Sequence, residues 1–122
     1  MSKILLVEDD KDTNEIYRLV LTKQGYNVTS AEDGEKGLSL AKEGGWDLIL
    51  LDIMMPKIDG LTLLTELKKN PPKTSNGPII ILTNLSHDKV TKDAIELGAK
   101  DCVVKSDITP GQLVEKIKKW LE

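Results

Sequence analysis

The sequence predicts an α/β protein with a doubly wound, five-stranded parallel sheet and helices on both faces. Short apolar runs at residues 4–7, 48–51 and 79–82 suit strands buried on both sides. Longer segments with helical periodicity separate them, and no long linker or low-complexity stretch interrupts the alternation. Strands joined through helices pair in parallel by right-handed crossovers. The length of 122 residues suits one domain, which we place at residues 1–122.

The first strand is expected at residues 3–7 and is followed by a helix. Asp12 and Glu15 have the spacing of a capping box at the start of this helix, and Gly25 ends it. Its apolar residues at helical spacing are Ile16, Leu19 and Val20.

Two further strand and helix units follow the same pattern. A strand at residues 27–31 precedes a helix from Asp33 to about residue 42, and a strand at residues 47–51 carries Asp52 at its tip. The next helix extends from about residue 59 to 69. The side chains expected to face inward from these helices are Leu38, Ala41, Leu61, Leu64 and Leu67.

The last two units follow a polar loop at residues 70–77. A strand at residues 79–82 ends on Thr83, and Ser86 is a candidate cap for the helix after it, which Gly98 ends. A short strand at residues 101–104 ends at Lys105. Thr109, Pro110 and Gln112 then provide the cap, first-turn proline and capping-box partner of the last helix.

The composition argues against a membrane protein, a secreted protein and a nucleic-acid-binding protein. The chain is 30% charged and has no apolar run near the roughly 20 residues of a membrane span, and its start does not resemble a signal peptide. We therefore expect a cytoplasmic protein without membrane contact. A net charge of -3 gives no basic surface for nucleic acid. Cys102, the single cysteine, lies before Val103 and Val104 and is expected to be a buried structural thiol.

The carboxyl ends of the strands collect the candidate functional residues, because ligands of open parallel sheets bind there. The first strand offers Glu8, Asp9 and Asp10, and the later ones offer Asp52, Thr83 and Lys105. Neighbouring carboxylates repel, at a cost of about 4 kcal/mol for two charges 4 Å apart at an effective dielectric of about 20, so they require a cation or protonation. With oxygen ligands only, Mg²⁺ or Mn²⁺ is favoured over zinc. A lysine and a hydroxyl suit a phosphoryl group carried on one carboxylate.

These residues resemble the receiver domain of bacterial two-component response regulators, of the single-domain chemotaxis-regulator type. The matching segments are residues 4–10, residues 51–56 with Asp59 and Gly60, residues 81–83, residues 98–101, and Lys105. The resemblance implies a flavodoxin-like sheet in the order 2-1-3-4-5. It also implies a cytoplasmic signalling protein that is not a turnover enzyme.

The same resemblance assigns roles to the site residues. Asp52 accepts a phosphoryl group from the phosphohistidine of a sensor histidine kinase or phosphotransfer protein. Asp9 binds Mg²⁺ directly, Glu8 acts through water, and the Met54 carbonyl is a further ligand. Lys105 binds a phosphoryl oxygen and Thr83 reports its arrival. The output is read by a downstream protein or a fused effector domain, usually through the helix after Thr83, the fifth strand and the last helix.

Three positions depart from the family pattern. Cys102 stands where an aromatic residue is usual, Ser106 where proline usually follows the lysine, and Asn84 where a smaller residue is preferred. Met54 and Leu85, which occupy positions that influence the attacking water, are apolar, so slow self-dephosphorylation is expected.

Two rival functions remain. A phosphohydrolase of the haloacid dehalogenase class requires a second acid two residues after the nucleophile, where this chain has Met54. A receiver-shaped interaction module that is never phosphorylated is supported only by the departures at Cys102 and Ser106. His87 is expected to be exposed. Trp46 and Trp120 are expected to pack against the core.

Overall fold

The computed structural model describes residues 2–84 and 88–122, and the predictions for Leu85, Ser86 and His87 lie outside them. The described residues form one parallel sheet in the order β2-β1-β3-β4-β5, as expected. The strands are β1 (Lys3–Val7), β2 (Asn27–Ala31), β3 (Leu48–Asp52), β4 (Ile79–Thr83) and β5 (Asp101–Val104). The helices are α1 (Lys11–Lys23), α2 (Gly34–Glu43), α3 (Gly60–Lys69), α4 (Asp88–Glu96) and α5 (Pro110–Trp120), with a short 3-10 turn η1 (Lys105–Asp107).

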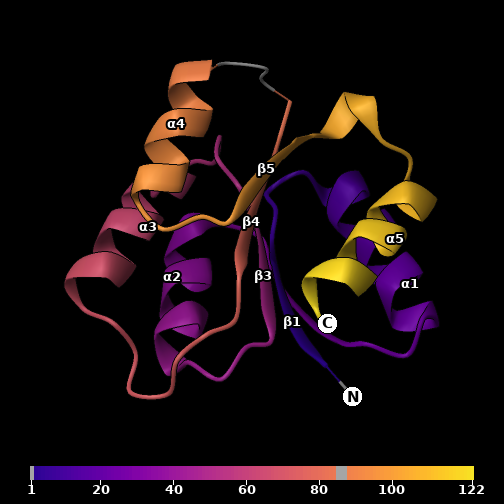
Figure 1. Ribbon diagram of the computed structural model, residues 1–122, viewed down its shortest axis with the longest axis horizontal. Coiled ribbons are helices and arrows are strands. Elements are labelled where there is room, and N and C mark those ends of the chain that lie inside the picture. Colours follow the sequence, from indigo (N-terminus) through magenta and orange to yellow (C-terminus); the bar gives the residue numbers. More distant parts are fainter. Residues whose placement is uncertain (1, 85–87) are drawn as a thin grey trace.

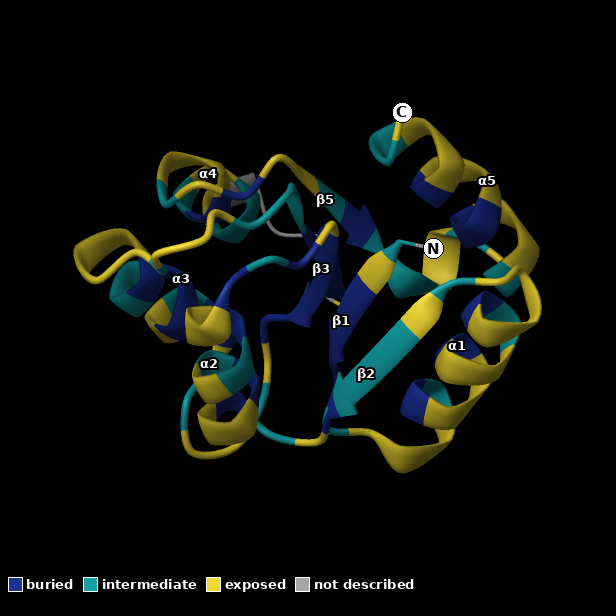
Figure 2. Cartoon of the chain, turned by 90° about the horizontal axis from the view of Figure 1, so that it is seen from below, coloured by how far each residue is buried: buried dark blue, intermediate teal, exposed yellow. Residues whose placement is uncertain are grey.

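The helices cover both faces of the sheet. In Figure 1, α1 and α5 lie on one side and α2, α3 and α4 on the other. Figure 2 shows the inner strands as buried, while most of the exposed residues lie on the outward faces of the helices. The central strands have helices on both sides, so they can be apolar along their whole length.

The core has two parts because successive residues of a strand point to opposite faces. On β3, Ile49 and Leu51 belong to the cluster under α2, α3 and α4, whereas Leu48 and Leu50 belong to the cluster under α1 and α5. The continuous apolar run that predicted this strand therefore fills both layers of the core.

Helix α1 differs from the prediction at its start. The carboxylate of Asp10 accepts a hydrogen bond from the Thr13 backbone N–H at 3.1 Å, so Asp10 caps the helix, and the capping box of Asp12 and Glu15 is wrong. The Thr13 hydroxyl also donates to Asp10. This second bond makes Asp10 the better cap.

The buried face of α1 also differs from the prediction. Tyr17 and Leu21 are buried, whereas Ile16 and Leu19 are exposed and Val20 is half-buried. Asn14 completes the buried line, because residues spaced by three and seven share a helix face. Ile16 is two residues beyond Asn14 and so lies about 200° around the helix, facing solvent.

The remaining expectations for helix faces are confirmed. Ala41, Leu64 and Leu67 are buried, and Leu38 and Leu61 pack partly buried against the same cluster. Trp46 is a packing residue, and its indole N–H donates to the Leu40 carbonyl at 2.8 Å.

No helix within residues 2–84 and 88–122 has the length and apolar character needed to cross a membrane.

Candidate functional site

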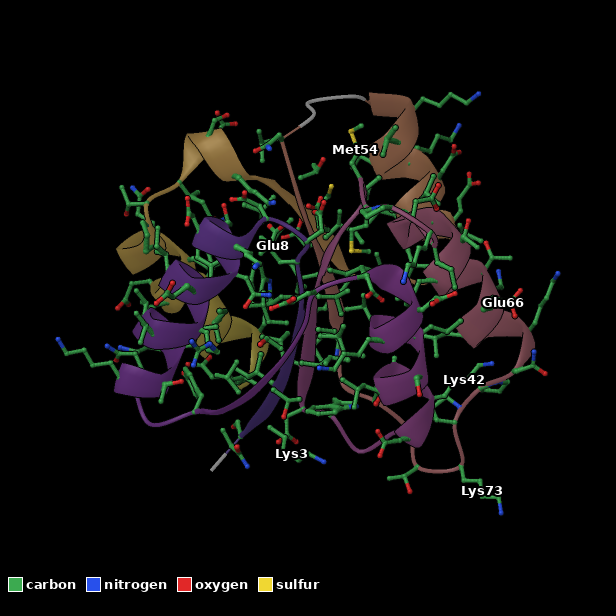
Figure 3. The ribbon with its side chains drawn as sticks, turned by 180° about the vertical axis from the view of Figure 1, so that it is seen from behind. Lys3, Glu8, Lys42, Met54, Glu66 and Lys73 are labelled. Carbon is green, nitrogen blue, oxygen red and sulfur yellow. The ribbon has the colours of Figure 1, made fainter. Side chains whose placement is uncertain are left out.

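Three carboxylates meet at the carboxyl edge of the sheet. Glu8 and Asp9 follow β1, and Asp52 is the last residue of β3. One carboxylate oxygen of each residue lies within 4.8 Å of the other two. Figure 3 shows Glu8 and Met54 near this edge, and the labelled lysines toward the opposite end of the molecule. The two strand ends are adjacent because β1 and β3 pair directly.

Lys105 brings a positive charge to this cluster from the far end of the chain. Its ammonium donates to Asp52 Oδ2 at 3.1 Å and to Glu8 Oε1. The three side chains are buried: that of Lys105 is 9% exposed, that of Asp52 8% and that of Glu8 2%. Lys105 follows β5 directly. Since β4 lies between β5 and β3 in the sheet, the Lys105 side chain reaches across the end of β4 to the acids.

The electrostatics of this group follow from its burial. Burial raises the pKa of the Glu8 carboxyl, and the nearby Asp52 carboxylate raises it further, against the opposing effect of the Lys105 ammonium. Burial acts against the charge of Lys105, but its hydrogen bond to Glu8 and the charge of Asp52 together raise its pKa above the usual range. Lys105 therefore keeps its positive charge, and its effect on Glu8 is smaller than the combined effect of burial and the Asp52 carboxylate.

Backbone N–H groups orient both buried acids. The Asp10 N–H donates to Glu8 Oε2 at 3.1 Å, and the Met54 N–H donates to Asp52 Oδ1 at 3.2 Å. Each of these bonds is made two residues after the acid that accepts it. Both carboxylates are thus held by the loop that follows their own strand.

Gly60, the first residue of α3, fixes the loop after Asp52. Its N–H donates to the Ile53 carbonyl at 2.8 Å. A Cβ at this position would lie 2.7 Å from the backbone oxygen of Asp52, closer than real Cβ contacts. The Gly60 in the sequence motif therefore lets the start of α3 pack directly against the end of β3.

A hollow of about 350 Å³ opens above the acids. Its described lining is Glu8, Asp9, Asp10, Thr13, Asp52, Met54, Asn84 and Lys105. Thr83 is buried at the end of β4, in register with Val104, so it lies at the same edge as the acids. The structure thus brings all of the predicted site residues to one edge of the sheet.

The predicted burial of Cys102 is only partly correct. Cys102 on β5 is half-buried and packs against the cluster under α4. Its sulfur accepts a hydrogen bond from the Thr91 hydroxyl of α4 at 3.6 Å. Cys102, which stands where the resemblance places an aromatic residue, therefore contacts α4.

The donor set suits a hard divalent cation. Three carboxylates supply oxygen atoms within the span of one ion, and among the described residues the cluster consists of carboxylates alone. Mg²⁺ and Mn²⁺ prefer such oxygen ligands. The residues that could hold the ion are Glu8, Asp9 and Asp52.

The family to which this chain belongs is shown by its match to a family model. The family model described as the response regulator receiver domain matches residues 4–118. The chain is a response regulator receiver domain. The match includes both acidic strand ends and Lys105, so the geometry described above belongs to the part of the chain that defines the family.

Curated relatives of this receiver domain are transcriptional regulators. It is 41% identical over 121 residues to a protein named probable transcriptional regulator ycf27 from Porphyridium aerugineum, covering 98% of this chain and 48% of that protein. It is 37% identical over 118 residues to the transcriptional regulatory protein CpxR homolog of Haemophilus influenzae, covering 97% of this chain and 49% of that protein. The chain thus spans about half the length of these relatives.

Solved receiver domains have the same fold. A CheY-like receiver domain protein from Methanospirillum hungatei superposes with a TM-score of 0.87 at 28% identity, covering 99% of this chain and 94% of that one. The BeF3-activated N-terminal receiver domain of Klebsiella pneumoniae RstA gives 0.86 at 31% identity, covering 99% of both chains. The predicted flavodoxin-like architecture is confirmed.

Sequence reasoning missed two polar residues near the site. Thr13 lines the hollow, and Asn14 is buried with its side-chain amide on the Glu8 carbonyl. Asn14 could have been found from its spacing, because it lies three and seven residues before the buried Tyr17 and Leu21. A polar residue on the core line of a helix generally has a hydrogen-bond partner.

Proposed function

We propose that this receiver domain accepts a phosphoryl group on Asp52 in an Mg²⁺-dependent reaction and then changes a partner-binding face. The phosphoryl donor is the phosphohistidine of a sensor histidine kinase or a phosphotransfer protein. The observation that supports this most strongly is the setting of Asp52, which lies at a strand end between the Lys105 ammonium and two further acids.

Phosphoryl transfer requires a nucleophile and stabilisation of negative charge. An Asp52 oxygen forms a bond to phosphorus while the bond from phosphorus to the donor nitrogen breaks, and that electron pair stays with the imidazole. A bound Mg²⁺ supplies charge neutralisation for the phosphoryl oxygens. Lys105, at 3.1 Å from Asp52 Oδ2, is placed to bind one of these oxygens.

The other site residues act on the ion or the bound phosphoryl group. Asp9 would bind Mg²⁺ directly, Glu8 would bind it through water, and the Met54 carbonyl would be a further ligand. Thr83 moves toward the phosphoryl group and passes its arrival to the surface of α4, β5 and α5. The Thr91 hydroxyl of α4 donates to the Cys102 sulfur of β5 within this surface, and Cys102 occupies the position where the family usually has an aromatic side chain.

The protein assists its own phosphorylation and dephosphorylation and is not a turnover enzyme. Met54 occupies the position where a haloacid dehalogenase phosphohydrolase has its second acid. Since the matching relatives are transcriptional regulators about twice as long as this chain, the phosphorylated state signals to an effector domain or to a separate downstream protein.

The test is the intact mass of the protein after incubation with acetyl phosphate and Mg²⁺. We expect one phosphoryl adduct on the wild type, and none with EDTA or on Asp52→Asn. Asp33→Asn is a matched control, because it changes an acid that caps α2 away from this cluster and should load normally. A folded wild type that binds Mg²⁺ but forms no adduct would instead favour the unphosphorylated interaction module.

Loss of the phosphoryl group should be slow. The Met54 side chain is 59% exposed beside Asp52, and it offers no polar group to orient an attacking water. Leu85 is the second apolar residue that the sequence assigns to this effect. We expect the double variant Met54→Asn with Leu85→Glu to have a shorter half-life than the wild type, and equal half-lives would contradict this.

A further inference from the structure

Asn14 connects the first turns of α1 to the acidic loop. Its side chain is buried, and Nδ2 donates to the Glu8 backbone carbonyl at 3.0 Å. Its own N–H donates to the Asp10 carbonyl at 2.9 Å, as the first helical hydrogen bond. Asn14 is therefore fixed in α1 by its backbone and reaches the site by its side chain.

The carbonyl that Asn14 binds belongs to the peptide between the two acids of the first strand end. That peptide is planar, so fixing its oxygen also fixes the direction of the Asp9 N–H and limits how Glu8 and Asp9 can rotate. The ladder of β1 ends one residue earlier, at Val7. Beyond it, the Glu8 N–H donates to the Ala31 carbonyl, and the Glu8 carbonyl is bound by Asn14.

Glu8 is thus held at three points, its N–H, its carbonyl and its carboxylate, by groups from β2, α1, the loop before α1 and η1. Its N–H binds Ala31, its carbonyl binds Asn14, and its carboxylate binds the Asp10 N–H and Lys105. The Asn14 contact sets the plane of the peptide that links the two acids. A change at Asn14 should therefore alter the geometry of the metal ligands rather than stability alone.

We infer that Asn14 is a positioning residue for the Glu8 and Asp9 pair, and that it sets Mg²⁺ affinity through the peptide that joins them. This inference rests on the proposed function of the site. Partners that orient metal ligands typically change metal affinity by 10- to 100-fold when they are lost. Asn14 reaches the site through the Glu8 carbonyl, so we expect its loss to weaken Mg²⁺ binding.

The test compares Asn14→Leu and Asn14→Ala with Leu21→Val. Leu21 is buried on the same helix one turn beyond Tyr17, and its shortening loosens α1 without removing a contact to Glu8. Calorimetric titration with Mg²⁺ should give about tenfold weaker binding for both Asn14 variants and unchanged binding for Leu21→Val. In the metal-free proteins, exchange of the Asp10 amide proton should be faster in the Asn14 variants only, because its acceptor is Glu8 Oε2.

Mg²⁺ affinity within twofold of the wild type in both Asn14 variants, with Asp10 exchange equal to that of Leu21→Val, would overturn the inference. The proposed function has a separate readout in the same samples, the Mg²⁺-dependent mass adduct of the wild type. Absence of that adduct would contradict the proposed function and not the role of Asn14. The exchange rates of the Asp10 amide are measured without metal, so they test the role of Asn14 whether or not Asp52 is phosphorylated.

Discussion

Leu50 and Asp52 lie two residues apart on β3, point to the same side of the sheet and are both buried, yet their surroundings are opposite in kind. Leu50 is fully enclosed by the apolar cluster under α1 and α5. Asp52 is the third carboxylate of a cluster whose oxygens lie within 4.8 Å of one another, with the ammonium of Lys105 beside it.

The body and the end of the strand therefore have separate roles. Buried apolar side chains stabilise the fold in proportion to the area removed from water. Buried like charges are destabilising until a cation or an added group compensates them. The apolar strand bodies therefore stabilise a charged edge that on its own would weaken the fold.

Loss of core packing at Leu50 should lower the stability of the fold more than any other change considered below. We predict that Leu50→Ala lowers the free energy of unfolding by about 2–5 kcal/mol, because it leaves a cavity at a fully buried site. Leu19→Ala is the same chemical change at a side chain that is 55% exposed, and it should cost less than about 0.5 kcal/mol. Urea denaturation measures both, and equal losses would contradict the assignment of the buried face of α1.

Substitution of Asp52 should change the free energy of unfolding by less than Leu50→Ala does, and in the opposite direction. In EDTA, Asp52→Asn should raise the free energy of unfolding by about 1 kcal/mol, because it removes repulsion from two acids while the amide can still accept from Lys105. Adding Mg²⁺ should stabilise the wild type more than the variant. Asp33→Asn should change neither value. A metal-free Asp52→Asn protein less stable than the wild type would show that the strand end is not strained by charge.

The smallest expected effect is the pH dependence that Glu8 contributes. Burial raises the pKa of Glu8, so the folded metal-free protein holds this proton more strongly than the unfolded chain. That contribution to stability is present below the ordinary glutamate pKa of about 4.3 and is lost as pH rises through the higher folded value. We predict that the wild type loses stability relative to Glu8→Gln over this range, by urea denaturation in EDTA. A difference that stays constant with pH would refute the shift.

Much of the fold could be predicted because its signals are local. Apolar runs identify β3 and β4, and the capping residues Thr109 and Gln112 mark the start of α5. The sheet order came from the family resemblance, since residue pattern alone does not order parallel strands. For α1 the local signal misled, because large aliphatic residues indicated one face while Asn14 and Tyr17 are the residues that the sheet buries.

The sequence indicated which residues form the candidate site, but it did not indicate the hydrogen bonds between them. Strand ends identified Asp52 and Lys105, because parallel strands bring their carboxyl ends together. The bond from Lys105 to Glu8 joins residues 97 positions apart, and the bond from Asn14 depends on the depth of α1 against the sheet. The sequence does not indicate which partner either side chain binds.

The most direct test of this account identifies which carboxylate carries the phosphoryl group. After loading with acetyl phosphate and Mg²⁺, an acyl phosphate can be reduced with borohydride, which converts a phosphorylated aspartate to homoserine. Peptide mass mapping then locates the change. We predict homoserine at position 52, with Asp9 unmodified. Reduction at Asp9, or at no aspartate in a sample that bears the phosphoryl mass, would contradict the assignment of Asp52 as the acceptor.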